Sequence, residues 1–209
     1  MNDLFKNVAG KNKEKLLMFL EASQLRFNEN LSILKTIKNE NIIAIINKGI
    51  IQIIKNDYNG SRTIIEELEE NDIFGSKISF INNDEYEIIT KTSCEITLID
   101  FDRISNYRGI KNESYNTFLN NLLNIIIKKM DEKNKRIEIL TRKTIRNKLL
   151  EYFKIESKKT NDKNIYLPFS FTDLADYLAV DRSAMSREIK YLKEEGFITI
   201  KQKKITLLY

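Results

Sequence analysis

The sequence predicts an α+β protein in which an antiparallel β-domain, one long helix and a small helical domain with a β-hairpin follow one another. Short apolar runs separated by turn residues fill most of residues 25–102. A helical period begins near residue 112, and the last third contains two short helices before an alternating segment. We therefore divide the chain into residues 1–112, 113–140 and 141–209.

The first part is expected to combine short helices with many strands. Residues 1–24 are predicted as helices that pack through four apolar side chains, Leu16, Leu17, Phe19 and Leu20. Six later runs are predicted as strands, because each is short, rich in isoleucine and bounded by turn residues. These runs are residues 31–37, 42–49, 50–57, 62–68, 86–92 and 94–101. Strands at this spacing favour an antiparallel barrel or jelly roll.

The long helix carries a repeating apolar seam. Its members alternate in spacing by four and three residues, with one charged break: Leu119, Leu123, Ile126, Met130, Lys133, Ile137 and Leu140. A seam of this kind can pack on a second copy of itself and give a two-fold homodimer. It can also lie along its own β-domain. The two arrangements are compatible, because one helix can use different faces for each contact.

The last part begins with another amphipathic helix, predicted over residues 142–156 and followed by a polar loop at 157–164. A short helix over residues 171–178 then has a start like a capping box, with Ser170 before it and Asp173 three residues later. Ala179 and Val180 form the turn to a second helix near residues 182–195. Asp181 is its predicted N-cap, and Gly196 supplies the left-handed residue that ends it.

This second helix has one basic face and one apolar face. At about 100° per residue, six cationic or hydroxyl side chains fall within an arc of roughly 140°: Arg182, Ser183, Ser186, Arg187, Lys190 and Lys193. Met185, Ile189 and Leu192 lie on the far side, where they can pack on the domain core. A helix of this form suits insertion into the DNA major groove, whereas most basic helices merely present a solvated surface.

The segment after Gly196 alternates apolar and polar residues about a turn at Gln202 and Lys203, which predicts a β-hairpin. Helix, turn, helix and hairpin together form a winged helix. Its basic wing (Lys201, Lys203 and Lys204) can touch phosphates.

The charge distribution agrees with a DNA-binding C-terminal part. The net charge is +5, and residues 141–209 hold 15 Lys and Arg against 9 Asp and Glu. The rest of the chain holds 20 against 21, so the positive surplus lies in the last third.

Composition bears on catalysis and location. The chain has no histidine and a single cysteine, so it lacks the residues of the common catalytic triads and the usual ligands of zinc sites. It also has no glycine-rich phosphate loop. We therefore expect no enzyme activity and no cofactor. A lone cysteine and the lack of a long apolar run favour a cytoplasmic protein without membrane contact.

The sequence resembles the Crp/Fnr family of bacterial transcription regulators along nearly its whole length. The resemblance is strongest in ADYLAVDRSAMSREIKYLKEEGFI (175–198), moderate in residues 45–76, and visible again in ITKTSCEITLID (89–100). It implies a β-roll like cyclic-nucleotide-binding domains, a dimerisation helix and a winged helix-turn-helix. It also implies three partners: double-stranded DNA, a second copy of the chain and, for an activator, RNA polymerase.

Carrying the family pattern over residue by residue gives a DNA-reading set. Catabolite-activator members have Arg-Glu and a second Arg where this chain has Arg182, Ser183 and Arg187, so both arginines are kept and each can fork onto a guanine. Ser186 with Arg187 resembles the Ser-Arg pair of Fnr-type members. The predicted DNA-binding residues are Arg182, Ser183, Ser186, Arg187, Lys190, Ser170 and Lys203. The operator should be pseudo-palindromic, with half-sites about 34–36 Å apart.

The family's phosphate-binding cassette is altered. It runs Phe-Gly-Glu-Leu and then Arg-Ser, whereas here Phe74 and Gly75 precede Ser76 and Lys77, and Asp84-Glu85 takes the place of Arg-Ser. Two carboxylates repel a phosphate, so we predict no useful cyclic AMP binding.

Other inputs of the family are also tested by composition. One cysteine is too few for an iron–sulfur cluster, and a haem-sensing member needs a histidine. Cys94 is expected to be a buried thiol. Two possibilities are left for the input: a small organic ligand bound near Ile88, Lys129 and Met130, or no effector at all. The alternative function is a ligand-sensing or protein-interaction module whose winged helix contacts protein instead of DNA.

Overall fold

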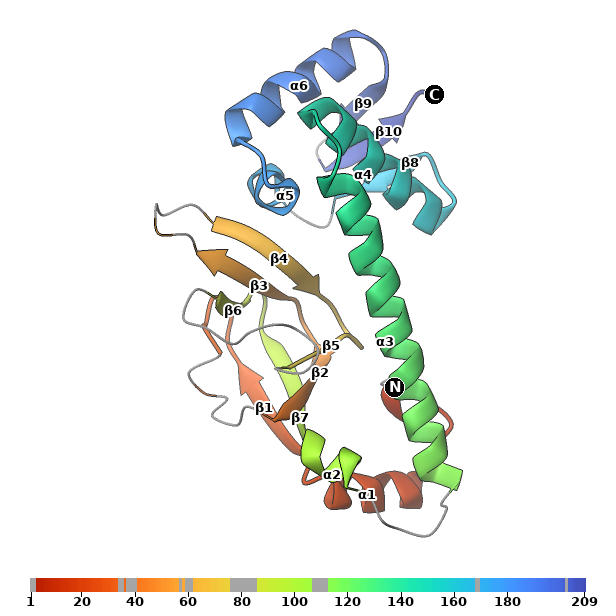
Figure 1. Cartoon of the computed structure of the whole chain (residues 1–209). Coiled ribbons are helices and arrows are strands. Elements are labelled where there is room, and N and C mark those ends of the chain that lie inside the picture. Colours follow the sequence, from red (N-terminus) through yellow and green to blue (C-terminus); the bar gives the residue numbers. More distant parts are fainter. Residues whose placement is uncertain are drawn as a thin grey trace. The chain divides into compact units, whose positions relative to one another are not determined.

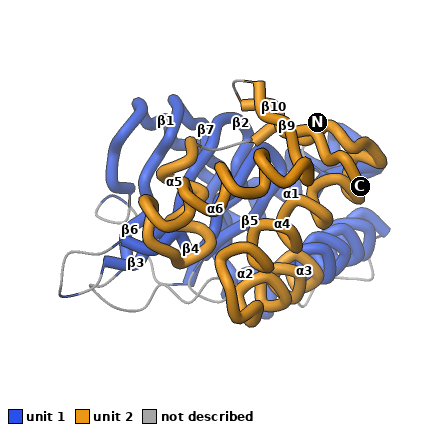
Figure 2. Tube along the Cα trace, turned by 90° about the horizontal axis from the view of Figure 1, so that it is seen from above, with its two compact units in different colours: residues 1–129 blue, residues 130–209 orange. Residues whose placement is uncertain are grey.

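The computed structural model describes residues 3–33, 36, 41–56, 58, 62–75, 86–106, 113–167, 170–201 and 203–209. Figure 1 shows a β-rich N-terminal part, the long helix α3 (Glu113–Leu140) and a C-terminal group of helices with short strands. The predicted α+β class is confirmed. The chain forms two compact units, residues 1–129 and 130–209, and α3 contributes residues to both (Figure 2). Within the described ranges, no helix has the length and apolarity needed to cross a bilayer.

Unit 1 is built on two antiparallel sheets. The first has the order β1 (Ser23–Phe27), β7 (Cys94–Asp100), β2 (Ile42–Lys48) and β5 (Ile73–Phe74). The second has the order β4 (Arg62–Leu68), β3 (Ile51–Asn56) and β6 (Tyr86–Thr90). Five of the six predicted runs therefore form strands. In the sixth, at 31–37, the described residues show a single bridge between Ser32 and Ile89.

The sequence of strand β2, Ile-Ile-Ala-Ile-Ile, is apolar without a break. Its side chains alternate between two cores, so both of its faces are buried. Ile43 and Ile45 pack toward the helices, in a core completed by Leu4, Phe5, Leu16, Leu20, Ile73, Ile99, Ile104, Tyr115, Phe118 and Leu122. Ala44 and Ile46 pack toward the other sheet, with Ile33, Ile51, Ile53, Leu68, Phe74, Ile88, Cys94 and Ile96.

The helical elements in the described part of unit 1 are η1 (Asp3–Phe5), α1 (Gly10–Phe19), α2 (Phe101–Ser105) and the first part of α3. Of the predicted N-terminal packing residues, Leu16 and Leu20 are buried, whereas Phe19 is 38% exposed. The amide side chain of Asn121 on α3 donates hydrogen bonds to the carbonyls of Leu4 and Lys6. These contacts fix the start of the chain against α3.

Two glycines of unit 1 occupy positions that a side chain cannot enter. Gly75 follows β5 with φ +149°, and a Cβ there would lie 2.1 Å from the carbonyl oxygen of Ile42. At Gly49, with φ +98°, a Cβ would lie 2.6 Å from the Cys94 Sγ atom. Both turns therefore depend on glycine for space as well as for backbone conformation.

In its described residues, unit 2 packs the end of α3 and three further helices on a small antiparallel sheet. The further helices are α4 (Ile145–Thr160), α5 (Phe171–Leu178) and α6 (Arg182–Glu194), and the strands are β8 (Asn164–Tyr166), β9 (Ile198–Lys201) and β10 (Lys204–Leu207). The sheet order is β8-β10-β9. Helix α4 begins later and ends later than predicted, because Thr144 caps its start and left-handed Asn161 ends it. Strand β8 was not predicted.

The exposed apolar side chains of α3 form a stripe that differs slightly from the predicted seam. Leu123, Ile127, Met130 and Ile137 are 56–62% exposed. Leu119 and Ile126, which the seam also included, pack against the core of unit 1 instead. The stripe keeps the spacing of four and three residues, but it is rotated toward the face opposite that core.

Candidate DNA-binding surface

Helix α5 is fixed by hydrogen bonds at both of its ends. The Ser170 hydroxyl accepts a hydrogen bond from the backbone N–H of Asp173 (3.1 Å) and donates one to the Asp173 carboxylate (2.8 Å). At the other end of α5, Ala179 is left-handed, with φ 50°. The N–H of Val180 bonds to the carbonyl of Ala175 (3.1 Å), which closes the helix.

Helix α6 has a defined start and a defined end. A carboxylate oxygen of Asp181 accepts a hydrogen bond from the N–H of Ala184 at 2.7 Å. Past the last turn, Gly196 has φ +76° and its N–H bonds to the carbonyl of Lys193, while the N–H of Phe197 bonds to that of Leu192. This pair of bonds is a Schellman motif, and it leads directly into β9.

The two predicted faces of α6 are present. Met185, Ile189 and Leu192 are buried in the core of unit 2. The five predicted DNA-binding residues of α6 are all exposed: Arg182, Ser183, Ser186, Arg187 and Lys190. In the part of the chain that the structure describes, neither Arg182 nor Arg187 forms a hydrogen bond or ion pair. Lys190 lies 3.7 Å from Glu194, an exposed and weak pair.

One arginine of α4 holds the opposite flank of α6. The Arg146 Nε atom is 2.7 Å from a carboxylate oxygen of Glu188, and Nη2 is 2.5 Å from one of Glu195. The hydrogen bonds that Arg146 donates, first to Glu195 and then to Glu188, raise the pKa of Arg146, and the guanidinium lowers the pKa of Glu195. Sequence reasoning missed this contact. The sequence feature that could have indicated this contact is the pair Glu188 and Glu195, which are seven residues apart and so share one face of a helix.

A second arginine joins α3 to α5 within unit 2. The Arg136 guanidinium lies 4.4 Å from the centre of the Tyr177 ring, and Nη2 donates a 3.2 Å hydrogen bond to the Tyr177 carbonyl. Burial raises the pKa of the Tyr177 hydroxyl. The ring also packs edge-on against Tyr152 of α4. The first helix of the helix-turn-helix is therefore attached to both α3 and α4.

The predicted wing is a two-stranded hairpin. Strands β9 and β10 pair in the register Lys201 with Lys204 and Ile205 with Ile200. Lys201 and Lys203 are exposed, while Lys204 lies 5.7 Å from the centre of the Tyr166 ring. Gln202, the other predicted turn residue, lies outside the described residues. Lys201 and Lys203, on either side of Gln202, are therefore open to solvent.

Residues 145–209 match the family model of the Crp-like helix-turn-helix domain. The C-terminal domain is Crp-like. A comparison with curated protein sequences gives no match.

Solved structures share the fold over most of the chain. A double mutant of CooA from Carboxydothermus hydrogenoformans is 16% identical, with TM-score 0.73 and coverage of 96% of this chain and 93% of that chain. A protein with a cyclic nucleotide-binding domain from Listeria monocytogenes is 18% identical, with TM-score 0.69 and coverage of 93% and 96%. A Crp/Fnr regulator from Thermus thermophilus is 16% identical, with TM-score 0.59 and coverage of 90% and 94%. The predicted Crp/Fnr resemblance is therefore confirmed.

The predicted effector residues of this Crp/Fnr fold are only partly described. Phe74 is 1% exposed and belongs to the core between the two sheets. Ser76, Lys77, Asp84 and Glu85 lie outside the described residues, so the expected loss of cyclic AMP binding stays a prediction. The side chains of Lys129 and Met130 lie on different faces of α3, because Lys129 pairs with Glu66 while Met130 belongs to the exposed stripe. Among the described residues, no cluster of metal-ligating side chains occurs.

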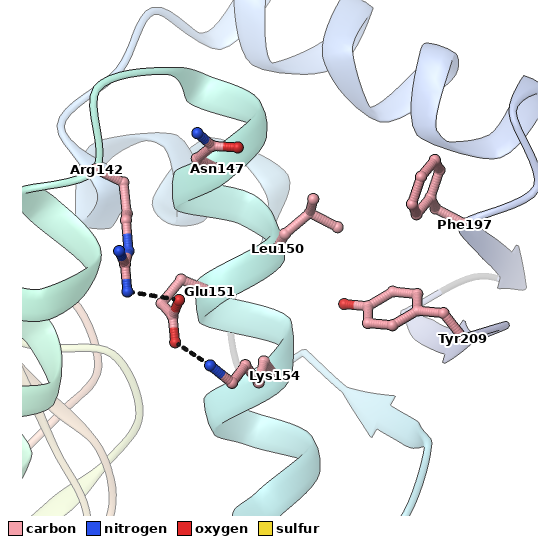
Figure 3. Close-up of a pocket in the computed structure, with 7 residues that line it drawn as sticks. All are labelled: Arg142, Asn147, Leu150, Glu151, Lys154, Phe197 and Tyr209. Carbon is pink, nitrogen blue, oxygen red and sulfur yellow. Dashed lines mark hydrogen bonds and ion pairs between the residues drawn. The ribbon is translucent and has the colours of Figure 1, made fainter.

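The Crp-like domain also has a cleft of about 340 Å³ beside α4 that sequence reasoning did not find (Figure 3). Its lining comprises Arg142, Asn147, Leu150, Glu151, Lys154, Phe197 and Tyr209. Glu151 accepts from both Arg142 (2.8 Å) and Lys154 (3.1 Å). The two cations of the cleft are therefore engaged internally, and none of the predicted DNA-binding residues lines it.

Proposed function

We propose that the protein is a DNA-binding transcription regulator that inserts α6 into the major groove. The observation that carries this proposal is the exposed face of α6, on which Arg182 and Arg187 have no partner among the described residues. Bidentate arginines are the commonest readers of guanine. Ser183 and Ser186 lie between them on the same face, and Lys203 of the wing supplies a phosphate contact.

The proposed active form is a homodimer that pairs through the stripe on α3. Four large apolar side chains at heptad-like spacing, Leu123, Ile127, Met130 and Ile137, are more than half exposed. A second α3 helix can cover them by coiled-coil packing. A two-fold axis then presents two α6 helices, so the operator is a pseudo-palindrome with half-sites about 34–36 Å apart.

The proposed input is an effector other than cyclic AMP, or none. With or without an effector, the proposed regulator acts in the cytoplasm, and an activator would also contact RNA polymerase. The altered residues after Gly75 support the exclusion of cyclic AMP, because Asp84-Glu85 replaces a phosphate-binding pair of the family.

Selection of bound duplexes from a random DNA library by the purified full-length protein tests this function. The expected result is an enriched inverted repeat, bound with an affinity that falls steeply as salt rises. Light scattering should give the mass of two chains. A monomer, or the lack of any enriched sequence at modest salt, would overturn the proposal in favour of a protein-interaction module.

A further inference from the structure

Lys129 joins α3 to both sheets of unit 1 through a single ammonium group. Its Nζ atom is 2.7 Å from a carboxylate oxygen of Glu66 on β4 and donates a 2.8 Å hydrogen bond to the carbonyl of Ile73 on β5. Strands β4 and β5 belong to different sheets. The side chains of Lys129 and Glu66 are each only 11% exposed. One cation therefore connects three elements in a largely buried place.

The strand register puts the Glu66 carboxylate beside apolar core residues. Glu66 lies opposite Ile53, and cross-strand partners share one face of a sheet. Ile53 is 1% exposed, and the next pair on that face is Ile51 with Leu68, both buried. A carboxylate placed there is costly unless a cation pairs with it. The ion pair with Lys129 therefore offsets part of the cost of placing Glu66 there.

Lys129 also shares a helix face with Arg136, the residue that holds α5. The two are seven residues apart, which at about 100° per residue leaves them within roughly 20° of each other. Lys129 pairs with Glu66 within unit 1, and two turns later on the same helix Arg136 stacks on Tyr177 within unit 2. A rotation of α3 that broke the first contact would also turn the face that carries Arg136.

We propose that the Lys129–Glu66 ion pair is an internal tether that keeps α3 in the register needed for DNA binding, so that no small-molecule effector is required. The inference rests on the proposed DNA-binding function. An effector shifts a conformational equilibrium by its differential affinity for two states. Here the differential interaction lies within the chain, so it does not depend on the concentration of any metabolite.

The first measurement is the affinity for the selected operator by fluorescence anisotropy, using full-length protein refolded from urea to remove bound small molecules. Wild type should bind without any addition. Lys129→Met and Glu66→Gln should each lose about 5- to 100-fold in affinity, the usual range for coupling between sites. Lys135→Met is the matched control, because it removes a cation of the same helix from an exposed pair with Asp131. It should bind like wild type.

The second measurement is urea unfolding of the two single variants and of the double variant Lys129→Met/Glu66→Gln, which needs no DNA. Each single change should lower the midpoint, and the double variant should unfold at higher urea than additivity predicts, because no buried charge is left without its partner. Additive midpoints would overturn the tether. So would wild type that binds the operator only after a metabolite extract is added, or a folded Lys129→Met protein with unchanged affinity. Failure of wild type to prefer any DNA, with or without extract, would instead overturn the proposed function.

Discussion

Four arginines of this chain fall into two groups that differ in what lies within their reach. Arg182 and Arg187 on α6 are exposed, and within the described ranges nothing in the chain binds them. Arg136 and Arg146, on α3 and α4, are engaged by Tyr177 and by a pair of glutamates. The side chains are chemically identical. Only the second group has acceptors placed by the fold.

This difference assigns the two groups different work. An engaged guanidinium has its donors directed at fixed partners, so its loss should lower stability. A guanidinium without a partner keeps its five donors in water, where its loss should hardly affect folding and should appear when an anion or a guanine is offered. The predictions below test whether stability and DNA affinity separate in this way.

The largest effect is expected from Arg187→Ala. It should weaken binding to the selected operator by about 1–3 kcal/mol, with the loss confined to operators that keep one particular guanine. The free energy of unfolding should change by less than about 0.5 kcal/mol, because the Arg187 side chain is exposed and forms no hydrogen bond or ion pair with the described residues. Anisotropy with matched and scrambled duplexes, alongside urea unfolding, measures both. Equal weakening on both duplexes would show that Arg187 contacts only phosphate.

Arg136→Met should show the reverse pattern. Losing the stacking on Tyr177 and the hydrogen bond to its carbonyl should lower the free energy of unfolding by about 1–2 kcal/mol. Arg136→Lys is the matched variant, since it keeps the charge but not the planar fork, and it should recover part of the loss. Unchanged unfolding midpoints in both variants would place Arg136 with the free arginines.

Lys203→Ala should have a smaller and less selective effect. A wing lysine that contacts phosphate adds affinity without reading sequence, so matched and scrambled duplexes should weaken equally. The slope of log affinity against log salt should become shallower by about 1. The measurement is a salt titration of wild type and variant. A sequence-selective loss would mean that the wing reads bases.

The smallest effect is expected from Tyr177→Phe, which removes the hydroxyl of the ring that stacks on Arg136. Burial raises the pKa of Tyr177 above its usual value near 10, so the folded state holds this proton more tightly than the unfolded state. Stability contributed by the group is present below pH 10 and is lost as the pH rises through the folded pKa. Wild type should therefore lose more stability than Tyr177→Phe between pH 9 and pH 11, as measured by urea unfolding. Parallel losses would show that the hydroxyl titrates normally.

The helix-turn-helix was predictable nearly to the residue, because its boundaries depend on local signals. Ser170, Asp181 and Gly196 each cap a helix through atoms within five residues. Strands β1 and β5 were not predicted. β5 has two residues, and β1 is defined by pairing with β7, about seventy residues later.

The partners of the engaged cations were equally distant in sequence. Arg146 meets Glu188 from 42 residues away, and Lys129 meets Glu66 from 63. Helical periodicity identified the exposed face of α6, since that face needs only a local repeat. It could not indicate which other cations would find an acceptor, because the sheet register and helix packing decide that.

The Schellman corner at Gly196 has a consequence for how the domain tolerates change in length. Because the Phe197 N–H is bonded back to Leu192 and β9 starts at the next residue, no slack separates the reading helix from the hairpin. One extra amino acid inserted after Gly196 would exchange the two sides of β9, turning Ile198 outward and the lysine of that strand inward. A change of length at this corner would therefore shift the side chains that we propose to face the groove relative to the wing lysines that we propose to face phosphate.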